Sequence, residues 1–183
     1  MSWGGSFNDI EHELEQCGAP KAADERKALA RELFNIGKAA LTAAFASAPG
    51  ILFVAAAGNS NNDASFTESM PADIVLPNLL TVGAVDRAGD EASFTSYGPT
   101  VKLHANGYQV ESFLPGGARV ALSGTSMAAP QVANLAAKLL AVNPTLTPAA
   151  LIGLITGTAE RSADGRRVLM HPKNALAAVQ AAR

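Results

Sequence analysis

The stretch Gly124-Thr125-Ser126-Met127-Ala128-Ala129-Pro130 decides how this chain folds. Proline has no backbone N–H and is tolerated in an α-helix only within the first turn, so a helix is expected to begin at Thr125 or Ser126. The apolar residues that follow, as far as Val142, predict that most of this helix is buried. A hydroxyl residue at a helix start is ordinarily an N-cap, and by itself the stretch favours that role for Ser126.

The same position also suits a nucleophile. At a helix N-terminus, unpaired amide groups and the helix dipole stabilise a developing oxyanion. Gly124 would then keep the approach to Ser126 open for a substrate. Both interpretations stay open on this stretch alone.

Upstream of this helix, two apolar runs predict buried strands. Residues 51–57 form a continuous apolar run that ends at Gly58-Asn59, and residues 79–85 form another. Strands buried on both faces are typical of parallel sheets. A long helical pattern precedes the first run, from Pro20 to Pro49, with apolar residues at three- and four-residue steps: Leu29, Leu33, Ile36, Ala40, Leu41, Ala44 and Phe45. This order of elements indicates an α/β fold.

The remaining segments complete this pattern. Residues 101–103, 109–113 and 119–122 are short, β-prone and separated by Gly and Pro, so we expect a small antiparallel segment before the Ser126 helix. Proline residues then mark two further helices, from Pro148 to about Thr156 and from Pro172 to the C-terminus.

Asn59 directly follows the first buried strand. The carboxyl edge of a parallel sheet is where α/β proteins place ligand sites, so its side-chain NH₂ could complete an oxyanion hole with the Ser126 amide. An asparagine in a left-handed turn after a strand is the commoner alternative.

Bulk composition excludes several classes of function. The 183 residues are 48% hydrophobic and 16% charged, with a net charge of -2 and no basic run, so no nucleic-acid partner is expected. No segment reaches the roughly 18 apolar residues of a membrane span. The single cysteine, Cys17, cannot form an intrachain disulfide. No signal peptide is recognised after Met1, and the compartment stays unknown.

Five segments of this chain together resemble the subtilase family of serine proteases. The Ser126 stretch resembles the family's Gly-Thr-Ser-Met-Ala-x-Pro nucleophile signature, and Ala56-Ala57-Gly58-Asn59 resembles its oxyanion segment. Residues 1–5, 81–86 and 92–99 resemble its Met-Ser-Leu-Gly-Gly, Val-Gly-Ala-Val-Asp and Ala-Ser-Phe-Ser-Ser-x-Gly-Pro segments. The resemblance implies the C-terminal part of a subtilisin-like fold, with a parallel sheet flanked by helices.

The resemblance also implies roles for individual residues. Ser126 resembles the acyl-forming nucleophile and Asn59 the oxyanion donor. Two strands that flank the primary substrate pocket are implied at Ser2, Trp3 and Gly4 and at Ala56, Ala57 and Gly58. The Met70-Pro71 peptide bond is expected to be cis.

The resemblance accounts for only part of a catalytic triad. In subtilases the order is Asp, His, Ser, and both partners precede the segment that here begins at Met1. His12, His104 and His171 match no catalytic position of the family. We therefore expect residues 1–183 to be a single partial catalytic domain without its Asp- and His-bearing half. Residues 8–30 would be an insertion, and in this chain alone Ser126 would act only as a helix cap.

Two functions follow, a serine endopeptidase fragment that works when complemented and a non-catalytic peptide-binding or scaffold module. An unrelated serine hydrolase is disfavoured, because Gly124 to Ala128 does not form a Gly-x-Ser-x-Gly elbow. The expected partners are a peptide or protein substrate and, at an exposed sheet edge, either the N-terminal half of the same protease or a second copy. No cofactor is expected, and calcium is left open because no carboxylate cluster supports it.

Overall fold

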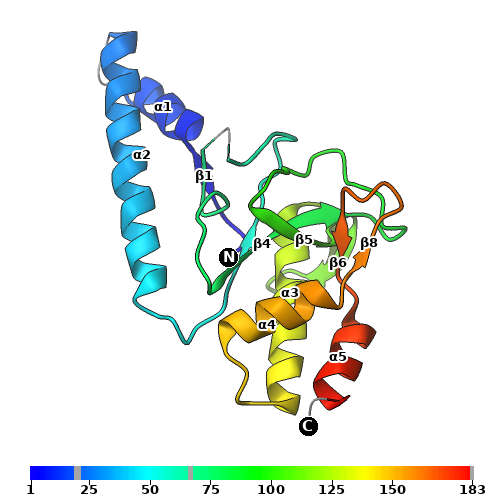
Figure 1. Cartoon of the computed structure of the whole chain (residues 1–183). Coiled ribbons are helices and arrows are strands. Elements are labelled where there is room, and N and C mark those ends of the chain that lie inside the picture. The colour runs from blue at the N-terminus through cyan, green and yellow to red at the C-terminus, as the bar shows by residue number, and fades with distance from the viewer. Residues whose placement is uncertain (19–21, 66–67, 182–183) are drawn as a thin grey trace.

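The computed structural model of the protein describes residues 1–18, 22–65 and 68–181. Its centre is a mixed, mostly parallel sheet in the order β2-β4-β5-β9-β8, in which only β8 runs antiparallel to its neighbour (Figure 1). The predicted α/β class and the parallel pairing of the two apolar runs are confirmed. The strands of this sheet are β2 (Phe53–Ala56), β4 (Leu79–Val85), β5 (Val101–Asn106), β8 (Glu160–Arg161) and β9 (Val168–Leu169).

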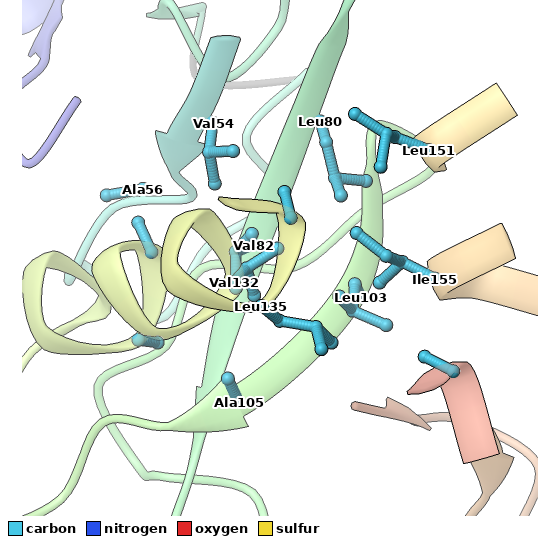
Figure 2. Close-up of a cluster of buried hydrophobic side chains, with 14 of the residues drawn as sticks. Val54, Ala56, Leu80, Val82, Leu103, Ala105, Val132, Leu135, Leu151 and Ile155 are labelled. Carbon is cyan, nitrogen blue, oxygen red and sulfur yellow. The ribbon is translucent and has the colours of Figure 1, made fainter. Parts of the chain in front are cut away.

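Three helices cover one face of the sheet: α3 (Thr125–Val142), α4 (Pro148–Gly157) and α5 (Pro172–Ala181). Figure 2 shows the core that they enclose, where Val132 and Leu135 of α3 face Val54, Leu80 and Val82 of the strands. Every residue of β4 is buried, as the apolar run predicted. Each fully buried Val or Leu side chain stabilises the fold by about 1.5–3 kcal/mol, so this layer holds α3 firmly in place.

A helical hairpin lies beyond the other face, formed by α1 (Phe7–Gln16) and α2 (Ala23–Ala46) (Figure 1). Phe45, near the C-terminal end of α2, packs on Ala55 and Leu79 and against the ring of Phe53, with 4.4 Å between ring centroids. Farther from the sheet, Phe34 packs with α1. The helix predicted from Pro20 begins at Ala23, and Pro20 itself lies outside the described residues.

The predicted helical pattern is confirmed, and its apolar residues in α2 are only partly buried. Leu33 and Ile36 are 41% and 58% exposed, whereas Phe34 and Phe45 are buried. The burial is uneven because α2 meets α1 near one end and the sheet near the other. Between these ends, Lys38 anchors the helix through an ion pair of 2.7 Å with Asp73.

The strands after residue 100 also differ from the prediction. Residues 101–106 form β5, which pairs parallel to β4 inside the main sheet rather than in an antiparallel segment. The connection between β4 and β5 returns to the end of the sheet at which β4 begins. The two strands therefore run in the same direction. Only β6 (Val110–Phe113) and β7 (Arg119–Leu122) form the expected antiparallel hairpin. Within the described ranges, no helix combines the length and the apolar character that crossing a membrane requires.

His104 is a buried polar residue in the middle of β5, only 6% exposed. It lies opposite Gly83 of β4, where a Cβ atom would come within 2.6 Å of the imidazole Cδ2, so glycine makes room for the ring. Its Nδ1 accepts a hydrogen bond from the Val168 N–H at 3.4 Å. Burial lowers the pKa of His104 below its usual value, and Arg167 lowers it further against the opposing effects of the Val168 bond and Glu91.

We predict that the free energy of unfolding decreases as the pH falls below about 6.5, the pKa of an unfolded histidine. Since the pKa of His104 is lower in the folded protein, the unfolded chain binds the proton more readily. The free energy of unfolding therefore falls on acidification below about pH 6.5 and recovers when the pH is raised again. Urea unfolding between about pH 7.5 and about pH 5.5 measures the effect. A His104→Gln variant should show a smaller pH dependence over this range, and equal slopes for both proteins would contradict the prediction.

Candidate active site

Ser126 is the second residue of α3, and it is not the N-cap. The N-cap is Gly124, which has no side chain, so the interpretation of Ser126 as a capping serine was wrong. Its hydroxyl instead donates a hydrogen bond to the Ser2 carbonyl at 2.9 Å. The predicted helix start at Thr125 is confirmed, but Pro130 is then the sixth helical residue and lies beyond the first turn.

Asn59 supplies the missing cap of α3 from the loop that follows β2. Its Oδ1 accepts hydrogen bonds from the Thr125 backbone N–H at 2.8 Å and from the Thr125 hydroxyl at 2.9 Å. The Thr125 hydroxyl accepts in turn from the Gly58 N–H at 3.1 Å. Because a backbone N–H can only donate, these bonds identify which end of the amide carries oxygen.

The opposite end of the Asn59 amide, the Nδ2 donor, lies beside Gly124. A Cβ atom at position 124 would come within 3.3 Å of Nδ2. Gly124 therefore makes room for the Asn59 amide, a role that complements the open approach to Ser126 expected from sequence. The arrangement places the amide donor of Asn59 at the N-terminus of α3, the helix that carries Ser126.

The first residues of the chain run along the edge of β2. The Met1 amino group donates to the Val54 carbonyl, and the Ala56 N–H donates to the Met1 carbonyl at 3.0 Å. Residues 2–4 therefore continue beyond the carboxyl end of β2, as residues 57–58 do, and both segments line one cavity. Between these two segments lies a cavity of about 510 Å³, whose lining includes Ser126, Asn59 and all six residues predicted to bind substrate.

The sequence did not assign several residues that also line this cavity. Asn8 and Asp9 come from the start of α1, within residues 8–30, the segment predicted to be an insertion. A Ser6 capping box holds Asp9, whose Oδ2 accepts from the Ser6 N–H at 2.6 Å. The pattern Ser-x-x-Asp in residues 6–9 is typical of a helix start, and it is the sequence signal that predicts a helix beginning next to the cavity.

Another wall of the cavity comes from β3 (Ser69–Met70), which pairs antiparallel with β1 (Gly5–Ser6). The Met70-Pro71 peptide bond is cis, as predicted. Gly4 approaches this wall so closely that a Cβ atom there would lie 2.9 Å from the Met70 carbonyl oxygen.

None of the chain's three histidines lines the cavity. His12 is exposed on α1 and contacts Gln16. His104 is committed to Val168 inside the sheet, and His171 accepts the Asn174 N–H at the start of α5. The site therefore has no imidazole beside the Ser126 hydroxyl. Among the described residues there is also no group of three or more side chains suited to holding a metal ion.

The subtilase family (Peptidase_S8) matches residues 1–175. The chain belongs to the subtilase family. Subtilisin-like protease 1 of Trichophyton verrucosum is 38% identical over 135 residues, which are 73% of this chain and 32% of the relative. A subtilisin-like serine protease of Penicillium rubens, Pen ch 13, is 41% identical over 93 residues, 51% of this chain and 22% of the relative.

Solved subtilase structures agree with the sequence comparison. A cold-adapted subtilisin-like serine proteinase superposes with a TM-score of 0.64 and 32% identity over 94% of this chain and 53% of its own. The self-cleaved protease domain of PatA gives a TM-score of 0.68 and 30% identity, over 77% and 55%. This subtilase chain thus spans about half the length of these solved domains and about a third or less of the curated relatives.

The Asn59 network predicts different stabilities for two substitutions. Asn59→Ala leaves the buried Thr125 N–H and hydroxyl without their acceptor, so the free energy of unfolding should fall by about 1–2 kcal/mol. Asn59→Asp keeps an acceptor oxygen and adds a negative charge at a helix N-terminus, so it should stay within about 0.5 kcal/mol of the native chain. Urea unfolding at neutral pH compares them, and equal destabilisation by both would contradict the capping role.

Proposed function

We propose that this chain carries the nucleophile and oxyanion site of a serine endopeptidase. The proposal rests on one observation: the end of β2 and the first turn of α3 bring the Asn59 amide and the Ser126 hydroxyl to the same cavity. Fixed donors beside a nucleophile are what acyl transfer needs, since charge develops on the carbonyl oxygen as the nucleophile adds. Here the donors would be Asn59 Nδ2 and the Ser126 N–H.

The proposed reaction has two halves. The Ser126 oxygen adds to the peptide carbonyl carbon while its proton passes to a base. The C–N bond then breaks, the leaving amine takes that proton, and an acyl ester remains on Ser126. Water next adds to the ester, giving its proton to the same base, and the acid product leaves as the Ser126 hydroxyl is restored.

The base is the component that this chain does not supply. A general base must hydrogen-bond the hydroxyl that it deprotonates, and the three histidines are engaged elsewhere. We therefore place the Asp and His on a partner segment, the N-terminal half of the same protease, that docks beside Ser126. In this proposal the chain alone hydrolyses no peptide bond.

The proposed substrate is an extended peptide or protein segment. The residues that would contact it are Ser2, Trp3 and Gly4 on one side and Ala56, Ala57 and Gly58 on the other, and they line the two sides of the cavity. Trp3 is 56% exposed there and offers an apolar surface to a substrate side chain.

The second candidate is a non-catalytic peptide-binding or scaffold module, alone or paired with a second copy. One observation favours it: the Ser126 hydroxyl is already bonded to a backbone carbonyl, with no imidazole at the site. A binding module, however, has no chemical need for both an oxyanion donor and a nucleophile. The two candidates differ in whether Ser126 can be acylated or phosphonylated.

Labelling with an activated phosphonate separates the two candidates. We expect Ser126 to be labelled when the chain is combined with an upstream subtilase half that carries Asp and His, and not when the chain is alone. Mass spectrometry of the digested protein locates the label, and a Ser126→Ala chain is the control. No labelling in a complemented sample that forms a stable complex would support the binding module instead.

Asn59→Asp tests the oxyanion donor in the complemented sample. The substitution keeps the cap on α3 but replaces the NH₂ donor with a carboxylate oxygen, so labelling of Ser126 should slow markedly. The expected loss is about 10²- to 10³-fold, the loss known for the oxyanion asparagine of subtilisin itself. Labelling at the native rate would show that Asn59 only caps the helix.

A further inference from the structure

Pro130 leaves one carbonyl of α3 without its usual partner. In an α-helix the N–H of each residue bonds the carbonyl four positions earlier, and proline has no N–H to donate. The carbonyl affected is that of Ser126. The Ser2 hydroxyl donates to this carbonyl at 3.0 Å, and so takes the place of the missing helical donor.

The contact between the two serines is reciprocal. The Ser126 hydroxyl donates to the Ser2 carbonyl, while the Ser2 hydroxyl donates to the Ser126 carbonyl. The two bonds join residues that are 124 positions apart in the sequence. They differ in what happens to them during catalysis, because only one of them uses the nucleophilic hydroxyl.

We propose that Ser2 is a positioning residue for Ser126, an inference that rests on the proposed function. When the Ser126 hydroxyl turns to its base and attacks, its bond to the Ser2 carbonyl is lost. The bond from the Ser2 hydroxyl to the Ser126 carbonyl is kept, and it holds the backbone of the nucleophile at the turn that Pro130 would otherwise loosen. The same bond also holds the Ser126 N–H, one of the two proposed oxyanion donors, in position.

The inference predicts a kinetic effect with a particular pattern. Ser2→Ala in the complemented protein should lower kcat for a peptide ester about 5- to 10-fold, the effect of one hydrogen bond, and leave KM unchanged. Ser2→Thr keeps a hydroxyl and should restore most of the loss. Ser47→Ala is the matched control, because Ser47 also donates to a carbonyl, that of Ala44 at 2.8 Å, but at the far end of α2.

Pro130→Ala provides the decisive comparison. Alanine restores an N–H at position 130, and Pro130 is exposed, so the change opens no cavity. With the helical donor back in place, the Ser2 hydroxyl becomes redundant. Ser2→Ala should then change kcat by less than about 2-fold in the Pro130→Ala background.

Three kinetic results would overturn the inference. The first is an unchanged kcat in Ser2→Ala, and the second is a full loss that persists in the Pro130→Ala background. The third is a rise in KM alone, which would make Ser2 only a wall of the substrate cavity.

Hydrogen exchange of the amides in residues 125–131, measured on the native chain and the same variants, needs no catalysis. Faster exchange in Ser2→Ala that returns to normal in the double variant supports the inference even if Ser126 is never labelled. Unchanged exchange in all variants contradicts it, so its failure remains distinct from failure of the proposed function.

Discussion

The side-chain amide of Asn59 is the interaction on which the rest of the site depends. It follows β2 in the chain, yet its oxygen caps α3 by accepting from Thr125, 66 positions later. A strand end and a helix start are thereby joined where each has unpaired backbone groups. Since the oxygen is committed to the helix, the NH₂ end has only one place to lie, beside Gly124 and the cavity. In the proposed enzyme, one side chain serves stability through its oxygen and stabilises the oxyanion through its NH₂ group.

The core of the protein makes this junction possible. β4 is buried along its whole length, and α3 packs over β2, β4 and β5, so neither partner of the junction can shift without disturbing the apolar layer. The first residues are attached more lightly, through Met1 to β2 and through Ser2 to Ser126. The cavity is therefore built from one rigid wall and one wall held mainly by hydrogen bonds.

The distribution of groups over the site has a chemical logic. Stabilising an oxyanion requires donors that are fixed before the reaction, and a packed strand and helix provide them. Moving a proton requires a base in contact with the nucleophile, and the three histidines of this chain are used in other ways: on the surface of α1, inside the sheet and at the start of α5. In the proposed enzyme, the two tasks belong to different segments of a subtilase domain about twice as long as this chain.

Local signals in the sequence determined much of this protein. Apolar runs located β2 and β4, prolines located α4 and α5, and short motifs identified the subtilase family and gave Ser126 and Asn59 as candidate site residues. The parallel pairing of β5, the exposed Leu33 and Ile36, and the α1 side of the cavity were decided by tertiary structure, because each depends on which element lies next to another. The same holds for Ser126. The pattern at residues 124–130 is compatible with Ser126 as the N-cap. In the folded protein Asn59 caps the helix instead, and the Ser126 hydroxyl donates to the Ser2 carbonyl, so two residues from distant segments decide its role.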